Sequence, residues 1–183
     1  MERPTAALTD IVALKTEYNF TVFASGVTDP TTGVLFNNRL RSFSAERDSP
    51  NALGPLRRPA HTLSPALALD AADCIPRFLL SSPGGPSQTI TLAQVLVNRL
   101  ALGQDLATSV ALPRWSVDLD GGLPAEVGVE EELLQASCRI GLAVKRSGAD
   151  TPYFGSAEII ERIEGGALSG MADLRREALA LGA

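Results

Sequence analysis

The 183-residue sequence predicts an α+β layered domain. Segments that read as strands come first, two helical patterns occupy the middle of the chain, and helix and strand alternate towards its end. A regular βαβ series would alternate from the start, so α+β is favoured. With 45% apolar and 20% charged residues the chain can bury one sizeable core, and we expect one domain over residues 1–183.

The first half of the chain contains the expected strands. A strand of mixed pattern is expected at residues 11–18. Residues 41–58 are rich in Ser, Pro, Asn, Gly and charge, which is typical of a long surface loop. Residues 63–70 and 75–82 are apolar segments on either side of Asp70-Ala71-Ala72-Asp73, and this arrangement predicts a hairpin of core strands.

The helices are expected in the second half. A helix should begin near Pro86, because proline suits a first helical turn, and should end at Gly103. The helix is predicted because five residues recur at three- and four-residue spacing: Leu92, Val95, Leu96, Arg99 and Leu100. Further helices are expected at 105–112 and 130–140, and further strands at 142–145 and 156–163. Trp115 is read as a packing residue, and Glu161, Glu164, Arg175 and Arg176 as solvated surface charge.

Composition excludes several classes of function. The formal charge is −5, from 16 Lys and Arg against 21 Asp and Glu, and no basic stripe suggests a nucleic-acid partner. No apolar run approaches the about 18 residues of a membrane span. The start MERPTAALTD does not resemble a secretory signal, so a cytoplasmic location is expected.

Metal and cofactor binding are not indicated either. Cys74 and Cys138 are far apart and are expected to be buried thiols rather than a disulfide or zinc ligands. His61 is the one histidine, so a multi-histidine site cannot form. We therefore expect neither a metal nor a cofactor.

The segment most suggestive of chemistry is Ser82-Pro83-Gly84-Gly85, where an apolar strand runs into a helix. Two glycines allow a sharp turn and close approach of a ligand, because no Cβ is in the way. Their N–H groups at a helix start favour a negative oxygen, as in an oxyanion hole. An ordinary strand-to-helix turn has the same residues, and these residues alone favour that plainer interpretation.

Several motifs occur in one order along the chain. They are TTGVLFNNRLRSFS at 31–44, PNALGPLRRPAHTLSPALAL at 50–69, SSPGG at 81–85, VALPRW at 110–115, FGSAEII at 154–160 and GMADLRREALALG at 170–182. Through them the chain resembles the small-subunit region of the γ-glutamyltransferase (γ-glutamyltranspeptidase) family of N-terminal-nucleophile hydrolases. The resemblance implies an αββα sandwich, with a large-subunit partner or a homo-oligomer.

The resemblance also implies a site for a small-molecule amide or γ-glutamyl-like substrate. Gly84 and Gly85 would be the oxyanion donors. The substrate-binding positions would be Asn19, Asn38, Arg39, Ser42, His61, Thr62 and Ser82. His61 and Thr62 stand where the family has paired serines that bind a substrate carboxylate. A loop role for His61 is the alternative.

The nucleophile is where the chain departs from the family. In such enzymes the first residue of the small subunit is a threonine, freed by self-cleavage, whose oxygen attacks the amide. This chain begins Met1-Glu2-Arg3, Thr5 is only a weak fallback, and Glu17 replaces a supporting threonine. We therefore expect no catalysis by the chain alone. The alternative is an inactive homologue that serves as a binding or structural subunit.

The expected substrate differs as well. Family members that act on γ-glutamyl compounds carry acidic residues after the Asn-Asn pair, whereas Arg39, Arg41 and Ser42 follow it here. Arginine removes the counter-ion for an ammonium group and suits a carboxylate. The resemblance is thus closer to the oxamate-amidohydrolase-like branch, and glutathione should bind poorly. Solvated loop cations are an equally weighted interpretation of Arg39 and Arg41.

Overall fold

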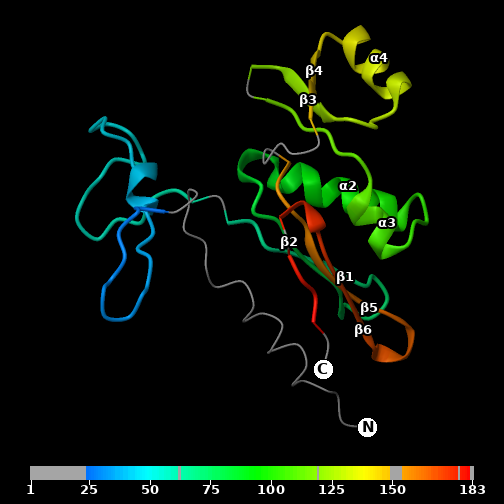
Figure 1. Ribbon diagram of the computed structural model, residues 1–183, viewed down its shortest axis with the longest axis horizontal. Helices are drawn as coiled ribbons and strands as arrows, with labels where there is room; N and C mark the ends of the chain where they lie inside the picture. The colour runs from blue at the N-terminus through cyan, green and yellow to red at the C-terminus, as the bar shows by residue number, and fades with distance from the viewer. Residues whose placement is uncertain (1–23, 62, 119, 149–153, 177, 182–183) are drawn as a thin grey trace. The chain divides into compact units, whose positions relative to one another are not determined.

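The computed structural model describes residues 24–61, 63–118, 120–148, 154–176 and 178–181 (Figure 1). The chain divides into two compact units, Met1–His61 and Thr62–Ala183, and each is described by itself. The expected strand at 11–18 lies outside the described residues, and the single-domain organisation stays a prediction. No helix in the described ranges is long and apolar enough to cross a membrane.

The first unit is irregular over its described residues. Its regular elements are the short 3-10 helix η2 (Arg39–Ser42) and two isolated bridges, Thr28 with Leu35 and Ser44 with Ala52. Most side chains here are exposed. The extended surface loop expected at 41–58 therefore agrees with the structure.

The second unit is built on a four-stranded antiparallel sheet in the order β1-β2-β5-β6. The strands are β1 (Ala66–Leu69), β2 (Pro76–Ser81), β5 (Glu158–Arg162) and β6 (Leu168–Ala172). The predicted hairpin is confirmed as β1 and β2, and the late strand as β5. β6 was not predicted from the sequence, because its residues LSGMA include a glycine and no β-branched side chain.

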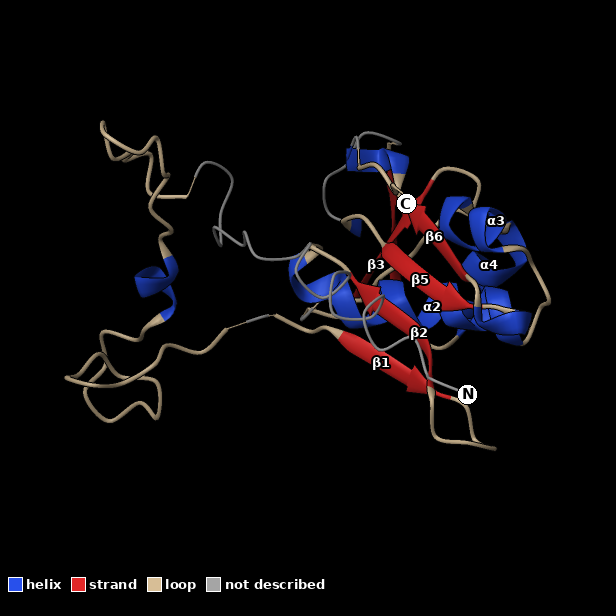
Figure 2. Ribbon diagram, turned by 90° about the horizontal axis from the view of Figure 1, so that it is seen from below, coloured by secondary structure: helices blue, strands red, loops and turns tan. Residues whose placement is uncertain are grey.

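Helices α2 (Gln88–Leu100) and α3 (Leu106–Ala111) cover one face of this sheet. Figure 2 shows the four strands in front and α2 behind them. Gly103 ends the α2 region in the left-handed conformation, with φ of 68°. Asp105 caps α3, because its carboxylate accepts the Thr108 N–H at 2.8 Å. Both helices agree with the sequence prediction. The remaining short helices are η3 (Gly85–Ser87), η5 (Glu164–Gly166) and η6 (Leu174–Arg176).

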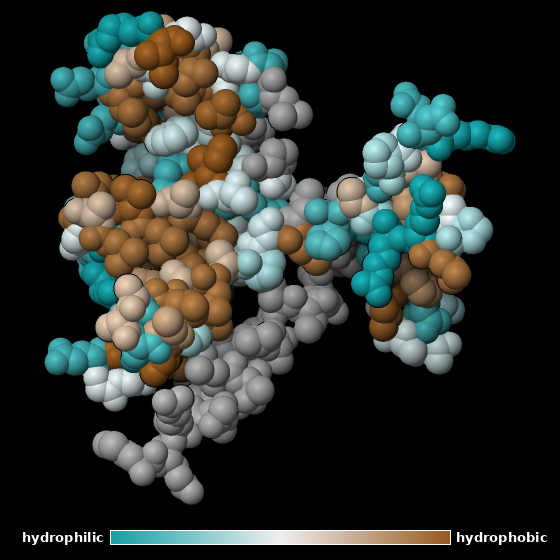
Figure 3. All heavy atoms as spheres, turned by 180° about the vertical axis from the view of Figure 1, so that it is seen from behind, coloured by the Kyte–Doolittle hydropathy of each residue, from teal (hydrophilic) through white to brown (hydrophobic). Residues whose placement is uncertain are grey.

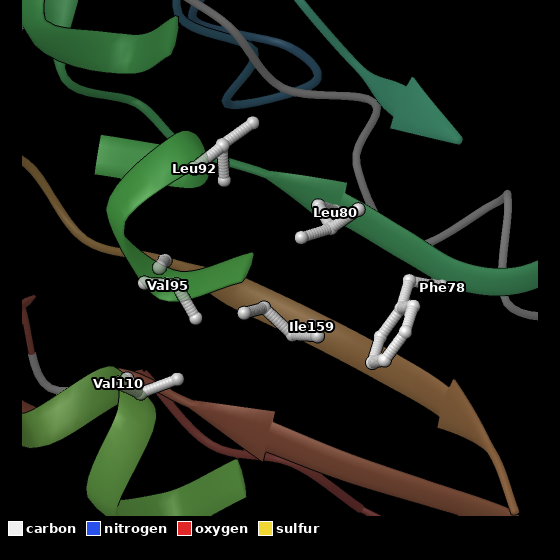
Figure 4. Close-up of a cluster of buried hydrophobic side chains, with 7 residues drawn as sticks. Phe78, Leu80, Leu92, Val95, Val110 and Ile159 are labelled. Atoms are coloured by element: carbon white, nitrogen blue, oxygen red, sulfur yellow. The ribbon is translucent and has the colours of Figure 1, made fainter. Parts of the chain in front are cut away.

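The main core lies between the sheet and these two helices (Figure 4). Leu92 and Val95 of α2 and Val110 of α3 point towards the strands. The buried members of the cluster are Phe78, Leu80, Leu92, Val95, Val110, Ala157 and Ile159. Successive strand residues point to opposite faces, so Phe78, Leu80 and Ile159 define the inner face of the sheet.

A smaller layer follows, made of β3 (Gly122–Glu126), α4 (Glu131–Arg139) and β4 (Ala143–Ser147). β3 and β4 are parallel, and α4 connects them. Leu123, Ala125 and Leu134 form its core, and Trp115 packs against them, which confirms Trp115 as a packing residue. β3 was not predicted from the sequence, and Pro124, a residue that argues against a strand, lies within it.

The expectations for the two cysteines and for Glu161 are wrong. Cys74 and Cys138 are exposed. Cys74 lies in the β1–β2 turn, and Cys138 lies near the end of α4. Glu161 is 2% exposed rather than solvated. It faces the helices from β5 and binds Arg99 of α2 through two contacts, at 2.8 and 3.0 Å. This pair adds a polar link between the sheet and α2.

Val95→Ala tests the main core against a matched control in the same helix. Val95 is 1% exposed and Val97 is 53% exposed. Val95→Ala should lower the free energy of unfolding by about 2 kcal/mol, because it removes buried methyl groups and leaves a cavity. Val97→Ala should change it by less than about 0.5 kcal/mol. Urea denaturation measures both. Equal losses would contradict this assignment of the inner face of α2.

Candidate functional site

The candidate site is the turn that joins β2 to α2. β2 ends at Ser81, and Gly84 is the residue before η3, which runs directly into α2. Gly84 has φ of −102°, whereas Gly85 has φ of 56°, in the left-handed region that favours glycine. The strand-turn-helix arrangement predicted for this segment is therefore present.

The N–H groups of Gly84 and Gly85 point to anion binding. Among the described residues, none accepts a hydrogen bond from either group, whereas the Gly84 carbonyl accepts the Ser87 N–H at 3.1 Å. Unpaired donors at a helix start carry partial positive charge. Two adjacent ones can stabilise a developing oxyanion.

Three buried polar side chains flank these two donors in the sequence. Ser82 Oγ, Ser87 Oγ and Gln88 Nε2 have no hydrogen-bond partner among the described residues. Their residues are at most 3% exposed. Buried polar atoms are normally paired, so such a group is unusual. Several buried polar atoms at this end of α2 thus have no hydrogen-bond partner among the described residues, which is typical of a site that binds a polar ligand.

Residues 154–158 support the turn and were not identified as site residues from the sequence. The Phe154 carbonyl accepts the Thr91 hydroxyl at 3.2 Å. Glu158 accepts the hydroxyls of Ser156, at 2.6 Å, and Ser81, at 3.2 Å. Ser81 directly precedes the turn, so Glu158 ties the end of β2 to the start of β5. The FGSAEII motif was the available signal, but its contacts depend on strand pairing.

The remaining predicted residues belong to the first unit. The Asn38 side chain donates to the Ala24 carbonyl at 2.7 Å. Ser42 Oγ lies 2.7 Å from the Arg39 carbonyl and 2.8 Å from the Ala60 carbonyl. These contacts organise the loop backbone, and His61 is exposed.

Four of the predicted positions are located in the first unit and three in the second. The first group is Asn38, Arg39, Ser42 and His61, and the second is Ser82, Gly84 and Gly85. Thr5, Asn19 and Thr62 lie outside the described residues. That these residues form one pocket stays a prediction.

Comparison with known proteins decides the family. Residues 10–183 match the family described as gamma-glutamyltranspeptidase. The chain belongs to this family.

Individual relatives agree with that assignment. The glutathione hydrolase-like YwrD proenzyme of Bacillus subtilis is 31% identical over 165 residues, covering 87% of this chain and 31% of its own length. The oxamate amidohydrolase proenzyme of Klebsiella pneumoniae is 30% identical, with coverage of 87% and 31%. This chain thus spans about a third of the length of these curated relatives, and the two identities do not separate one branch of the family from the other.

A solved structure confirms the fold class. The gamma-glutamyltranspeptidase of Pseudomonas nitroreducens, solved in complex with L-DON, superposes with a TM-score of 0.75 at 21% identity. The match covers 92% of this chain and 91% of that chain. The α+β fold of the N-terminal-nucleophile type is therefore shared.

In this family member a buried ion network joins the smaller layer to the sheet. Arg114 and Asp173 lie 2.6 Å apart and are each 2% exposed. Arg175 binds Glu126, at the end of β3, at 2.8 Å, and Asp173 at 3.2 Å. Burial lowers the pKa of Arg114 from its ordinary value, but an arginine pKa starts so high that the side chain keeps its charge. Arg175 is only partly exposed, so its assignment to solvated surface charge is wrong.

Asp173→Asn tests the network. It would leave the buried Arg114 guanidinium without its counter-charge, which should lower the free energy of unfolding by about 3–5 kcal/mol. The control is Glu131→Gln, which breaks the Glu131–Arg146 pair, where the side chains are 59% and 60% exposed. Solvent screens this pair, so no measurable change is expected. Thermal unfolding followed by circular dichroism compares the two, and equal effects would refute a special role for the network.

Proposed function

We propose that this chain is the small-subunit-like part of an amide hydrolase or acyltransferase, in which Gly84 and Gly85 form the oxyanion hole. One observation carries the proposal. The two consecutive N–H groups at the start of η3 have no acceptor among the described residues. Family membership supports the reaction class, and the lack of an acceptor for these two N–H groups supports their role as oxyanion donors.

The chemistry follows from where charge develops. When a nucleophilic oxygen attacks an amide carbonyl, the carbonyl oxygen becomes an anion in the tetrahedral intermediate. The Gly84 and Gly85 N–H groups would donate to this anion. Because the donors are fixed by the backbone, they need little reorganisation during the reaction. One such donor is typically worth about 10²–10³ in kcat.

The proposed substrate is a small amide that carries a carboxylate, of the oxamate type, rather than glutathione. Arg39 and Arg41 lie in η2, in the loop that follows Asn37-Asn38. Guanidinium groups pair with carboxylates and repel the α-ammonium group of a γ-glutamyl substrate. The choice between branches rests on this charge alone.

The nucleophile is proposed to come from outside the described residues. Thr5 is the first threonine in the sequence, and it lies outside the described residues. The curated relatives are proenzymes, and this chain spans about a third of their length. We propose that turnover needs the large-subunit polypeptide, and that the chain alone has no activity.

Turnover is tested with the chain alone and with the large-subunit polypeptide from the same source. Oxamate and a γ-glutamyl anilide serve as substrates, and intact-mass measurement during their turnover reports any covalent acyl adduct. We expect turnover only with the partner, with kcat/KM at least about tenfold higher for oxamate, which is about 1.4 kcal/mol of discrimination. Peptide mapping of the adduct then identifies the nucleophile.

Each result has a distinct meaning. A preference for the γ-glutamyl anilide would overturn the proposed substrate but not the reaction class. Absence of both turnover and adduct would overturn the enzymatic proposal, and would favour an inactive homologue that acts as a binding or structural subunit.

The outer face of the sheet supports the proposed partner. Leu67, Leu79, Ile160 and Gly170 are register neighbours across all four strands, on the face away from α2. Leu67 and Leu69 are 56% and 52% exposed. Figure 3 shows a different side of the second unit, where hydrophobic residues also gather over its middle. Contiguous apolar surface of this kind is typical of a protein interface.

Leu67→Glu tests this interface. A buried unpaired carboxylate is costly, so the substitution should weaken association with the large-subunit polypeptide at least tenfold. The matched control is Leu100→Glu, because Leu100 is 52% exposed but belongs to α2. Sedimentation of the 19.2 kDa chain with its partner measures both. Equal weakening, or a wild-type chain that stays monomeric in the mixture, would exclude this face.

A further inference from the structure

Gly155 lies closer to the candidate oxyanion turn than any residue with a side chain could. A Cβ added at Gly155 would be 2.5 Å from Gly84 Cα, 2.9 Å from Gly84 N and 3.2 Å from Ser82 Oγ. Ordinary van der Waals contact begins at 3.4 Å. A side chain at Gly155 would thus have to separate the two backbone segments by about 1 Å.

Seen from Gly84, the two backbones are in ordinary contact and the Ser82 hydroxyl is the closer neighbour. A Cβ added at Gly84 would lie 3.5 Å from Gly155 Cα and 3.1 Å from Ser82 Oγ. The Ser82 hydroxyl is therefore close to both glycines. Any displacement of Gly155 towards the turn is transmitted to Gly84 directly, because no flexible side chain lies between the two backbones to absorb it.

The segment that carries Gly155 is itself held on both sides. Phe154 is fully buried, and its carbonyl accepts the Thr91 hydroxyl of α2 at 3.2 Å. The Ala157 N–H donates to Asp173 Oδ2 at 3.1 Å. Asp173 belongs to the buried ion network, and β5 begins at Glu158. With one side of the contact anchored in this way, the Ser82–Gly85 turn is the part that would yield.

We propose that Gly155 is a positioning residue that sets the location of the Gly84 N–H. It touches no substrate and acts through the backbone of the turn. Its effect on position follows from packing alone, whereas its effect on catalysis rests on the function proposed above. Misplacing a catalytic group by about 1 Å can lower a rate about 100-fold.

Another glycine supplies the control for backbone strain. Gly155 has φ of 62° and Gly103 has φ of 68°, so alanine is strained to a similar degree at either position. An added Cβ at Gly103 meets nothing within 4 Å. Gly155→Ala and Gly103→Ala therefore differ in the steric contact with Gly84.

The positional part is tested on the full 15N-labelled chain, without any substrate. Amide chemical shifts and hydrogen exchange of Gly84 and Gly85 should change in Gly155→Ala and stay at wild-type values in Gly103→Ala. Unchanged Gly84 and Gly85 amides in Gly155→Ala, or equal changes in both variants, would overturn the proposal.

If Gly155→Ala does not fold, the variant Thr91→Val tests the same proposal. It keeps the side-chain shape but removes the hydroxyl that holds the Phe154 carbonyl, and so loosens the same segment without adding a Cβ. The Gly84 and Gly85 amides should again shift, by less than in Gly155→Ala. If they do not respond, the segment does not position the turn.

The catalytic part is tested on the chain combined with its large-subunit polypeptide. Gly155→Ala should lower kcat about 100-fold with KM little changed, because the oxyanion forms only in the transition state. Gly103→Ala should keep the wild-type kcat. A raised KM at unchanged kcat would refute positioning. If the wild-type protein shows no turnover but Gly155→Ala shows the predicted amide shifts, the proposed function is overturned and the positional inference stands.

Discussion

The second unit depends on a set of charges removed from water. Arg114 and Asp173 are almost fully buried, and Arg175 and Glu126 complete the network around them. The four groups come from the segment after α3, the end of β3 and the segment after β6. Their mutual pairing offsets the free-energy cost of removing these charged groups from water, which an unpaired charge would leave uncompensated. Hence the smaller layer and the sheet form one structure even though their apolar cores are separate.

The same network reaches the candidate site through one residue. Asp173 binds Arg114 and also accepts the Ala157 N–H, two residues from Gly155. Gly155 in turn packs on Gly84. The placement of the proposed oxyanion donors is therefore linked to the most buried charges of the unit by contiguous contacts. A donor held in this way needs little rearrangement as charge develops on a substrate, which is the main contribution that a protein makes to this type of catalysis.

The two faces of the main sheet have different roles. The inner face packs against α2 and α3, and the bidentate Arg99–Glu161 pair fixes the helix across it. The outer face presents an apolar row to the surface through Leu67, Leu79 and Ile160. A strand alternates its side chains, so a sheet that is apolar on both faces needs cover on both. Here helices supply one cover, and the proposed partner would supply the other.

Local sequence was sufficient for the elements whose signals are contained within a few residues. Asp105 and Gly103 mark helix ends through capping and a left-handed φ, and the hairpin of β1 and β2 follows from two apolar runs around a polar turn. The ordered motifs were sufficient for the family. β3 and β6 could not be predicted in this way, since Pro124 and Gly170 argue against strands and pairing with neighbours overrides that preference.

The sequence by itself determined the family, the α+β class and the position of the Gly84-Gly85 turn. Tertiary structure alone decided that Glu161 and Arg175 are ion-pair partners rather than solvated charges, and that Gly155 is packed against Gly84. The reason is the same in each case. Burial and close backbone contact arise between residues tens of positions apart. A local pattern of polarity or spacing does not predict which distant segment will pack against a given residue.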